Sequence, residues 1–152
     1  MAADDRTSEI RRLLLGATVH SVGRAADMGV VEFAARHDEV INAHLQCPFR
    51  IVQEGKLLIG SRDMRYAQRG AGAEAFDRFE TVYDSRAATL NGVLERLRPV
   101  VGEVALGDAG SVTVEWQPGF RLEVFPDCSG SVESWRVFVR GGRHVGFPEG
   151  VV

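Results

Sequence analysis

The sequence predicts an α+β protein built from two similar four-strand antiparallel β-meander halves, with one helix before the first half and another between the halves. Three observations lead to this fold class. Apolar and polar side chains alternate with a period of two in both halves, as in half-buried strands. Two further stretches place apolar residues at helical spacing. A hairpin-like stretch also occurs twice, at a constant offset of 86 residues.

The repeated hairpin covers residues 47–60 and 134–146. Each copy has an aromatic residue followed by Arg, an aliphatic strand, a glycine turn and a second strand that ends in Gly. The matched pairs are Phe49/Trp135, Arg50/Arg136, Ile51/Val137, Gly55/Gly141, Ile59/Val145 and Gly60/Gly146. Any two hairpins share glycines and alternation, so chance similarity is the alternative. Because a hairpin does not require Arg after the aromatic residue, the match favours internal duplication.

In the first half, residues 5–15 are expected to form a short amphipathic helix that Gly16 ends. Its apolar face consists of Ile10, Leu13 and Leu14. Strands are expected at about 17–26, around 31–33 and at 40–46, the last with a clear alternation of apolar and polar residues. The first hairpin then completes a four-strand meander.

Residues 61–83 interrupt the β pattern with several arginines and a flexible Gly-Ala-Gly-Ala segment. A helix capped by Asp84 or Ser85 is expected to run to Pro99. Its apolar face consists of Leu90, Val93, Leu94 and Leu97. Strands resume at 111–116 and 122–124, and the second hairpin comes after them. We therefore expect a single domain over 1–152, with repeats at about 18–60 and 100–147 connected by 61–99.

Composition restricts the classes of function. A hydrophobic content of 45% with 26% charged residues is typical of a globular protein with a real core. The net charge of −3 argues against a nucleic-acid partner. Neither a signal peptide nor an apolar run long enough for a bilayer is visible, so we expect a cytoplasmic protein without membrane contact. Cys47 and Cys128 fit no metal or disulfide pattern, and reduced thiols are expected.

Four residues are candidates for a ligand site: Arg50, Arg136, His44 and Arg62. The two hairpin arginines lie on the strand faces opposite the aromatic residues. One interpretation is a cross-strand ion pair in each half, with Glu32 and Glu115 as partners. The other is a pair of guanidinium groups lining a groove for a carboxylate or phosphate.

His44 lies on a polar strand face, and Arg62 begins an arginine-rich loop at 62–69. Phosphate-binding glycine motifs, a nucleophile elbow and metal-ligand spacings are all absent from the sequence. His44 and Cys47 are three positions apart on one extended segment, so they would point to opposite faces and not form a catalytic pair. We therefore assign no catalytic residue, metal or cofactor.

Four runs of the sequence carry a resemblance: His44–Ile51, Gly60–Asp63, Leu122–Asp127 and Glu133–Arg136. They resemble a family of small uncharacterised actinobacterial proteins. The resemblance extends over most of the chain from about residue 17. Some relatives of this type are immunity proteins encoded beside polymorphic toxins, so the resemblance implies a bacterial toxin-neutralising function. It brings no known reaction and no catalytic residue with it.

Two functional hypotheses result. The first is a non-enzymatic cytoplasmic protein that binds another protein, with toxin neutralisation as its leading form, because an acidic surface suits capture of a basic toxin domain. A second copy of the chain is a further candidate partner. The alternative is a small-ligand binding protein or enzyme with a carboxylate or phosphate site between the two β halves.

Overall fold

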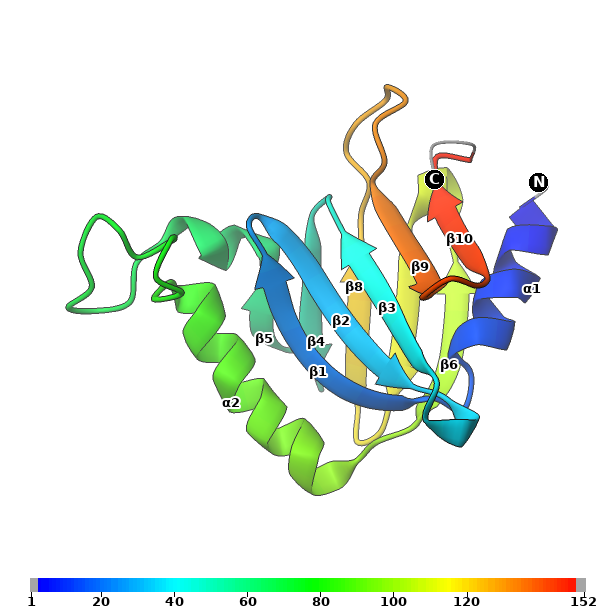
Figure 1. Cartoon of the computed structure of the whole chain (residues 1–152), viewed down its shortest axis with the longest axis horizontal. Helices are drawn as coiled ribbons and strands as arrows, with labels where there is room; N and C mark the ends of the chain where they lie inside the picture. Colours follow the sequence, from blue (N-terminus) through cyan, green and yellow to red (C-terminus); the bar gives the residue numbers. More distant parts are fainter. Residues whose placement is uncertain (1–2, 150–152) are drawn as a thin grey trace.

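The computed structural model describes residues 3–149, which form two α-helices and ten β-strands (Figure 1). The helices are α1 (Ala3–Leu14) and α2 (Val82–Leu97). The first-half strands are β1 (Thr18–Ala25), β2 (Met28–Ala34), β3 (Val40–Leu45), β4 (Phe49–Gln53) and β5 (Lys56–Gly60). The second-half strands are β6 (Val101–Leu106), β7 (Val112–Trp116), β8 (Phe120–Val124), β9 (Trp135–Val139) and β10 (His144–Phe147). Short 3₁₀ turns are η1 (Arg36–Asp38), η2 (Ser61–Arg65) and η3 (Asp108–Gly110). The α+β class with antiparallel sheets, an N-terminal helix and a mid-chain helix is confirmed.

The strands form two antiparallel five-stranded sheets, and the two halves of the chain exchange their hairpins. Sheet 1 has the order β1-β2-β3-β9-β10, and sheet 2 has the order β5-β4-β8-β7-β6. Each half therefore contributes a three-strand meander to one sheet and its hairpin to the other. The central pairings, β3 with β9 and β4 with β8, both join strands of different halves.

This arrangement differs from the expected four-strand meanders in two ways. Each half has five strands within the described residues, and the hairpin leaves the meander instead of completing it. The strand missing from the expectation is β6. A β-bulge between Val101 and Glu103 shifts the register there, so the two buried residues of the strand, Val101 and Val104, are three positions apart. A bulge of this kind hides a strand from an alternation pattern.

The register of the two hairpins agrees with the offset of 86 residues. Ile51 lies opposite Ile59 in the first hairpin, and Val137 lies opposite Val145 in the second. The helices also occupy related places, since α2 packs beside β1 and β5 while α1 packs beside β6 and β10 (Figure 1). An isolated bridge between Thr18 and Val100 joins the starts of β1 and β6.

The core lies between the sheets and is closely packed. Both hairpin aromatics are buried as expected, with Phe49 3% exposed and Trp135 1% exposed. Phe33 and Trp116 on neighbouring strands are 0% and 1% exposed. Trp135 donates its indole N–H to the Gly110 carbonyl at 2.7 Å. One void between the sheets is about 10 Å³, roughly the least that one water needs. This void has no room for a ligand.

Candidate functional site

The structure places the two hairpin arginines on opposite outer faces of the sandwich. Arg50 lies on β4 in sheet 2 and Arg136 lies on β9 in sheet 1. The inward positions beside them, Phe49 and Trp135, fill the core between the sheets. The two guanidinium groups therefore do not line one groove, and the site expected between the halves is not formed.

Both arginines have glutamate neighbours, but not those expected from the sequence. Arg50 Nε lies 2.8 Å from Glu123 Oε1, and these two residues are direct cross-strand partners. Arg136 Nε lies 3.9 Å from a carboxylate oxygen of Glu133, which is three residues earlier. The pairing with Glu32 and Glu115 is wrong, because the hairpins cross to the other sheet.

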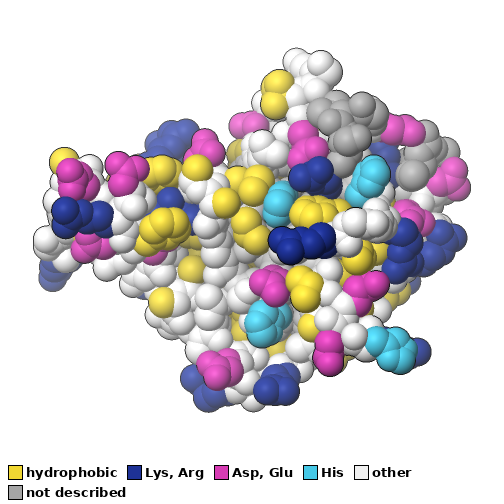
Figure 2. Space-filling view, viewed as in Figure 1, with side chains coloured by type: hydrophobic (Ala, Val, Ile, Leu, Met, Phe, Trp, Pro, Cys, Tyr) yellow, Lys and Arg dark blue, Asp and Glu magenta, His cyan; other side chains and the backbone are white. Residues whose placement is uncertain are grey.

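His44 and Arg136 are brought together as cross-strand partners on the outer face of sheet 1. The His44 ring packs edge-on against Phe138 at 4.7 Å, and the Arg136 guanidinium lies over the same ring at 4.6 Å. Burial, followed by the nearby Arg136 charge, lowers the pKa of His44. Figure 2 shows histidine, arginine and hydrophobic side chains gathered on this face. His44, Phe138 and Arg136 therefore stack on one another at the surface and do not surround a pocket for an anion.

Arg62 is exposed on η2. Cys47 is buried, and burial raises the pKa of its thiol to about 12. A thiol of that pKa stays protonated at neutral pH and is a poor nucleophile. Within residues 3–149, no group of three or more His, Cys, Asp or Glu side chains could hold a metal ion.

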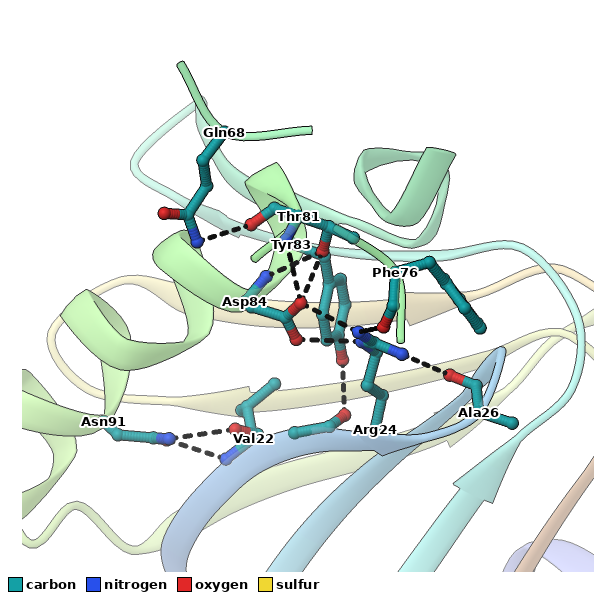
Figure 3. Close-up of polar contacts among 10 residues, drawn as sticks. Val22, Arg24, Ala26, Gln68, Phe76, Thr81, Tyr83, Asp84 and Asn91 are labelled. Carbon is teal, nitrogen blue, oxygen red and sulfur yellow. Dashed lines mark hydrogen bonds and ion pairs between the residues drawn. The ribbon is translucent and has the colours of Figure 1, made fainter. Parts of the chain in front are cut away.

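A different polar cluster, which the sequence did not reveal, surrounds Arg24 on β1 (Figure 3). The Arg24 side chain is 1% exposed, and it binds the Asp84 carboxylate through two nitrogens at 2.8 and 2.9 Å. It also donates to the carbonyls of Ala26 and Phe76. Its guanidinium lies between two aromatic rings, 4.3 Å from Phe76 and 4.1 Å from Phe79. The Arg24 guanidinium therefore makes its hydrogen bonds and its ring contacts with other residues of the protein.

The partner carboxylate lies in the first turn of α2. The expected cap at Asp84 or Ser85 is wrong, because the helix begins at Val82 with Thr81 as its N-cap and Asp84 is the third helical residue. Asp84 accepts hydrogen bonds from the backbone N–H and the hydroxyl of Thr81, and Thr81 in turn caps the N–H of Asp84. Burial alone would raise the pKa of Asp84, but the hydrogen bonds from Arg24 and Thr81 outweigh it and lower the pKa. The carboxylate is therefore ionised at neutral pH, and it ties the start of α2 to β1.

Two further contacts fasten α2 to the edge of sheet 1 (Figure 3). The side-chain amide of Asn91 exchanges two hydrogen bonds with the backbone of Val22, at 2.8 and 2.9 Å. The Tyr83 hydroxyl donates to the Gly23 carbonyl at 2.6 Å. These contacts give hydrogen-bond partners to backbone groups that would otherwise be unpaired on an edge strand.

The Arg24 cluster fixes residues 61–81, which extend beyond the sandwich and form a segment that we call the protrusion (Figure 1). Backbone hydrogen bonds close its base, from Val82 N to Tyr66 O and from Gln68 N to Glu80 O, each 2.8 Å long. Three aromatic side chains remain exposed on it: Tyr66 by 53%, Phe76 by 37% and Phe79 by 55%. The protrusion also carries the exposed arginines Arg62, Arg65, Arg69 and Arg78.

Comparison with protein-family models, with curated proteins and with solved structures found no match. Among the described residues, neither helix is sufficiently long and apolar to cross a membrane. What the site can bind therefore follows from its own side chains. The protrusion combines exposed aromatic and arginine side chains on a backbone that is held at its base.

Proposed function

We propose that this chain is a non-enzymatic cytoplasmic protein that binds another protein through the protrusion. The observation that carries the proposal is that Tyr66, Phe76 and Phe79 stay exposed on a segment whose backbone is fixed by a buried ion pair. Exposed aromatic and arginine side chains dominate the energetics of protein interfaces. A segment that is already ordered loses little conformational entropy when it binds.

The protrusion connects β5 to α2. Its Met64 side chain packs in the core, but Tyr66, Phe76 and Phe79 do not belong to the core. Exposed aromatic side chains carry a solubility cost, so their presence on this segment supports a role in recognition.

Toxin neutralisation is the leading form of this function. It is supported by the resemblance of the runs around His44–Ile51 and Glu133–Arg136 to the actinobacterial family with immunity relatives. In that case the partner is a toxin domain encoded beside the gene, and binding covers or distorts its active surface. Arg50 and Arg136 lie on opposite faces, so they do not support the small-ligand alternative.

The test looks for a toxin domain encoded by a flanking gene, purifies it, and measures its binding by titration calorimetry and its activity with and without this protein. Flanking genes that encode no toxin domain would contradict toxin neutralisation. Tyr66→Ser changes a side chain on the protrusion that is 53% exposed, and Val132→Ser, on the β8–β9 loop and 65% exposed, is the control. We expect Tyr66→Ser to weaken binding by about 30-fold, the factor for a hot-spot residue worth about 2 kcal/mol. Unchanged binding by Tyr66→Ser and Phe79→Ser together would contradict the proposal.

A further inference from the structure

A second surface lies between α2 and the β4–β5 hairpin, where a groove of about 370 Å³ opens to solvent. Its floor is apolar and consists of Leu57, Leu58, Leu90 and Val93. Leu57 is 53% exposed, although it lies on a strand of the sandwich. An apolar floor of this kind at the edge of a sheet is a surface to which an apolar ligand or segment can bind.

The charged residues that line the groove have one sign. They are Lys56 on β5 and Arg86 on α2, and no Asp or Glu lines it. The whole chain has a net charge of −3, so a cationic groove is a local departure from the overall balance. A groove at the end of sheet 2 shows the opposite chemistry, with Glu54, Glu103 and Glu115 against a single arginine. Charge complementarity therefore favours an anionic occupant for the groove beside α2.

The two hairpins differ at the apolar floor. At the offset of 86 residues, Leu57 corresponds to Arg143 and Leu58 to His144. A register irregularity between Ile51 and Val52 pairs Val52 with Leu57 in the first hairpin, whereas Phe138 pairs with His144 in the second. Leu58 packs against the core, but Leu57 is 53% exposed. Core packing therefore does not account for the leucine at position 57.

We propose that this groove binds an amphipathic helix of the protein partner that carries Asp or Glu beside its apolar stripe. Apolar side chains spaced by about one helical turn lie on Leu57, Leu58 and Val93, and the carboxylates approach Lys56 and Arg86. This is the helix-in-groove mode of recognition. The inference rests on the proposed function, because it names the chemistry of one segment of the same partner. The groove and the protrusion are both built on α2, at Arg86–Val93 and at its capped start.

The test is a display library of 16-residue peptides with randomised positions, selected on the folded full-length protein. We expect selection to enrich peptides with Leu or Phe at i, i+3, i+4 and i+7 and with Asp or Glu beside them. The enriched peptide is then titrated by fluorescence anisotropy. Leu57→Arg with Leu58→His puts the polar residues of the second copy on the floor of the groove. We expect that pair, and separately Arg86→Glu, to weaken binding at least tenfold.

Arg140→Glu, a charge reversal at the exposed end of β9, is the matched control and should bind like the parent. The proposal is overturned if no peptide is enriched, if the enriched peptides lack acidic residues, or if the Leu57→Arg, Leu58→His pair binds them unchanged. It is also overturned if decanoate alone perturbs the amide NMR signals of the groove while no peptide does. In each of these cases the Tyr66→Ser experiment still stands, so failure here is distinct from failure of the proposed function.

Discussion

Replacing Arg24 by Met should destabilise the protein strongly and release the protrusion. The substitution keeps a side chain of similar length but removes the charge and all four side-chain hydrogen bonds. Two of those bonds go to Asp84, whose side chain is 12% exposed, and the other two go to the carbonyls of Ala26 and Phe76. A buried carboxylate then remains without its cation.

The size of the effect depends on the contacts that Asp84 keeps. Removing one partner of a buried ion pair costs about 3–5 kcal/mol. Asp84 retains two hydrogen bonds from Thr81 and the favourable dipole at the start of α2, so the lower end applies. We expect Arg24→Met to reduce the free energy of unfolding by about 3 kcal/mol, a large part of the usual 5–15 kcal/mol.

Urea denaturation followed by tryptophan fluorescence measures this loss. Hydrogen exchange measures the loss of stability within the protrusion. The reporters are the amides of Gln68 and Glu80, which donate hydrogen bonds there. The lowered pKa of Asp84 adds a pH test. Its stabilisation is complete above the unfolded pKa of about 3.9 and is lost as the pH falls through the lower folded pKa. Arg24→Met should weaken this acid sensitivity. If the variant unfolds within 0.5 kcal/mol of the parent, roughly the scatter of a neutral surface change, the anchoring argument is wrong.

Three further predictions concern the core, a surface histidine and the thiols. Phe49→Ala and Trp135→Ala should each cost about 3–5 kcal/mol in urea melts, because both rings are buried at matched positions; parent-like melting by either would refute the matched core. Since the folded pKa of His44 lies below its unfolded value, stability should rise with pH just below 6.5, and His44→Gln should flatten that slope; equal slopes for both proteins would count against it. At pH 8, Ellman's reagent should modify exposed Cys128 quickly in the native protein and buried Cys47 only after unfolding, and two fast thiols would contradict this.

The sequence predicted the features that depend on local periodicity. The offset of 86 residues identified both hairpins and the burial of Phe49 and Trp135. Alternation tells which side chains face a core, but it does not tell which sheet a strand joins. The hairpin exchange was therefore not predictable, since it depends on pairings between β3 and β9 and between β4 and β8.

The Arg24 cluster could not be predicted from the sequence for a related reason. Arg24 and Asp84 are 60 positions apart, so no local motif contains both of them. Phe76 and Phe79 are visible as aromatic residues in an irregular segment, where the pattern indicates a short helix or a hydrophobic contact with the next helix. Their packing on a guanidinium exists only after α2 has docked on β1. Long-range polar contacts of this kind leave no periodic signal in a sequence.

The pseudo-symmetric architecture gives a physical way to separate folding from function in this chain. Where the halves agree, as at the hairpin glycines and the buried aromatics, a common backbone geometry explains both copies. Where they differ at an exposed position, as at Leu57 and Arg143, core packing does not account for the choice. The groove contains such a position, and the groove and the protrusion both adjoin α2. A partner that contacts both needs about 800 Å² of this protein's surface for a stable complex. Substitutions at Tyr66 and Leu57 would then both weaken the same complex, while neither side chain contributes to the core.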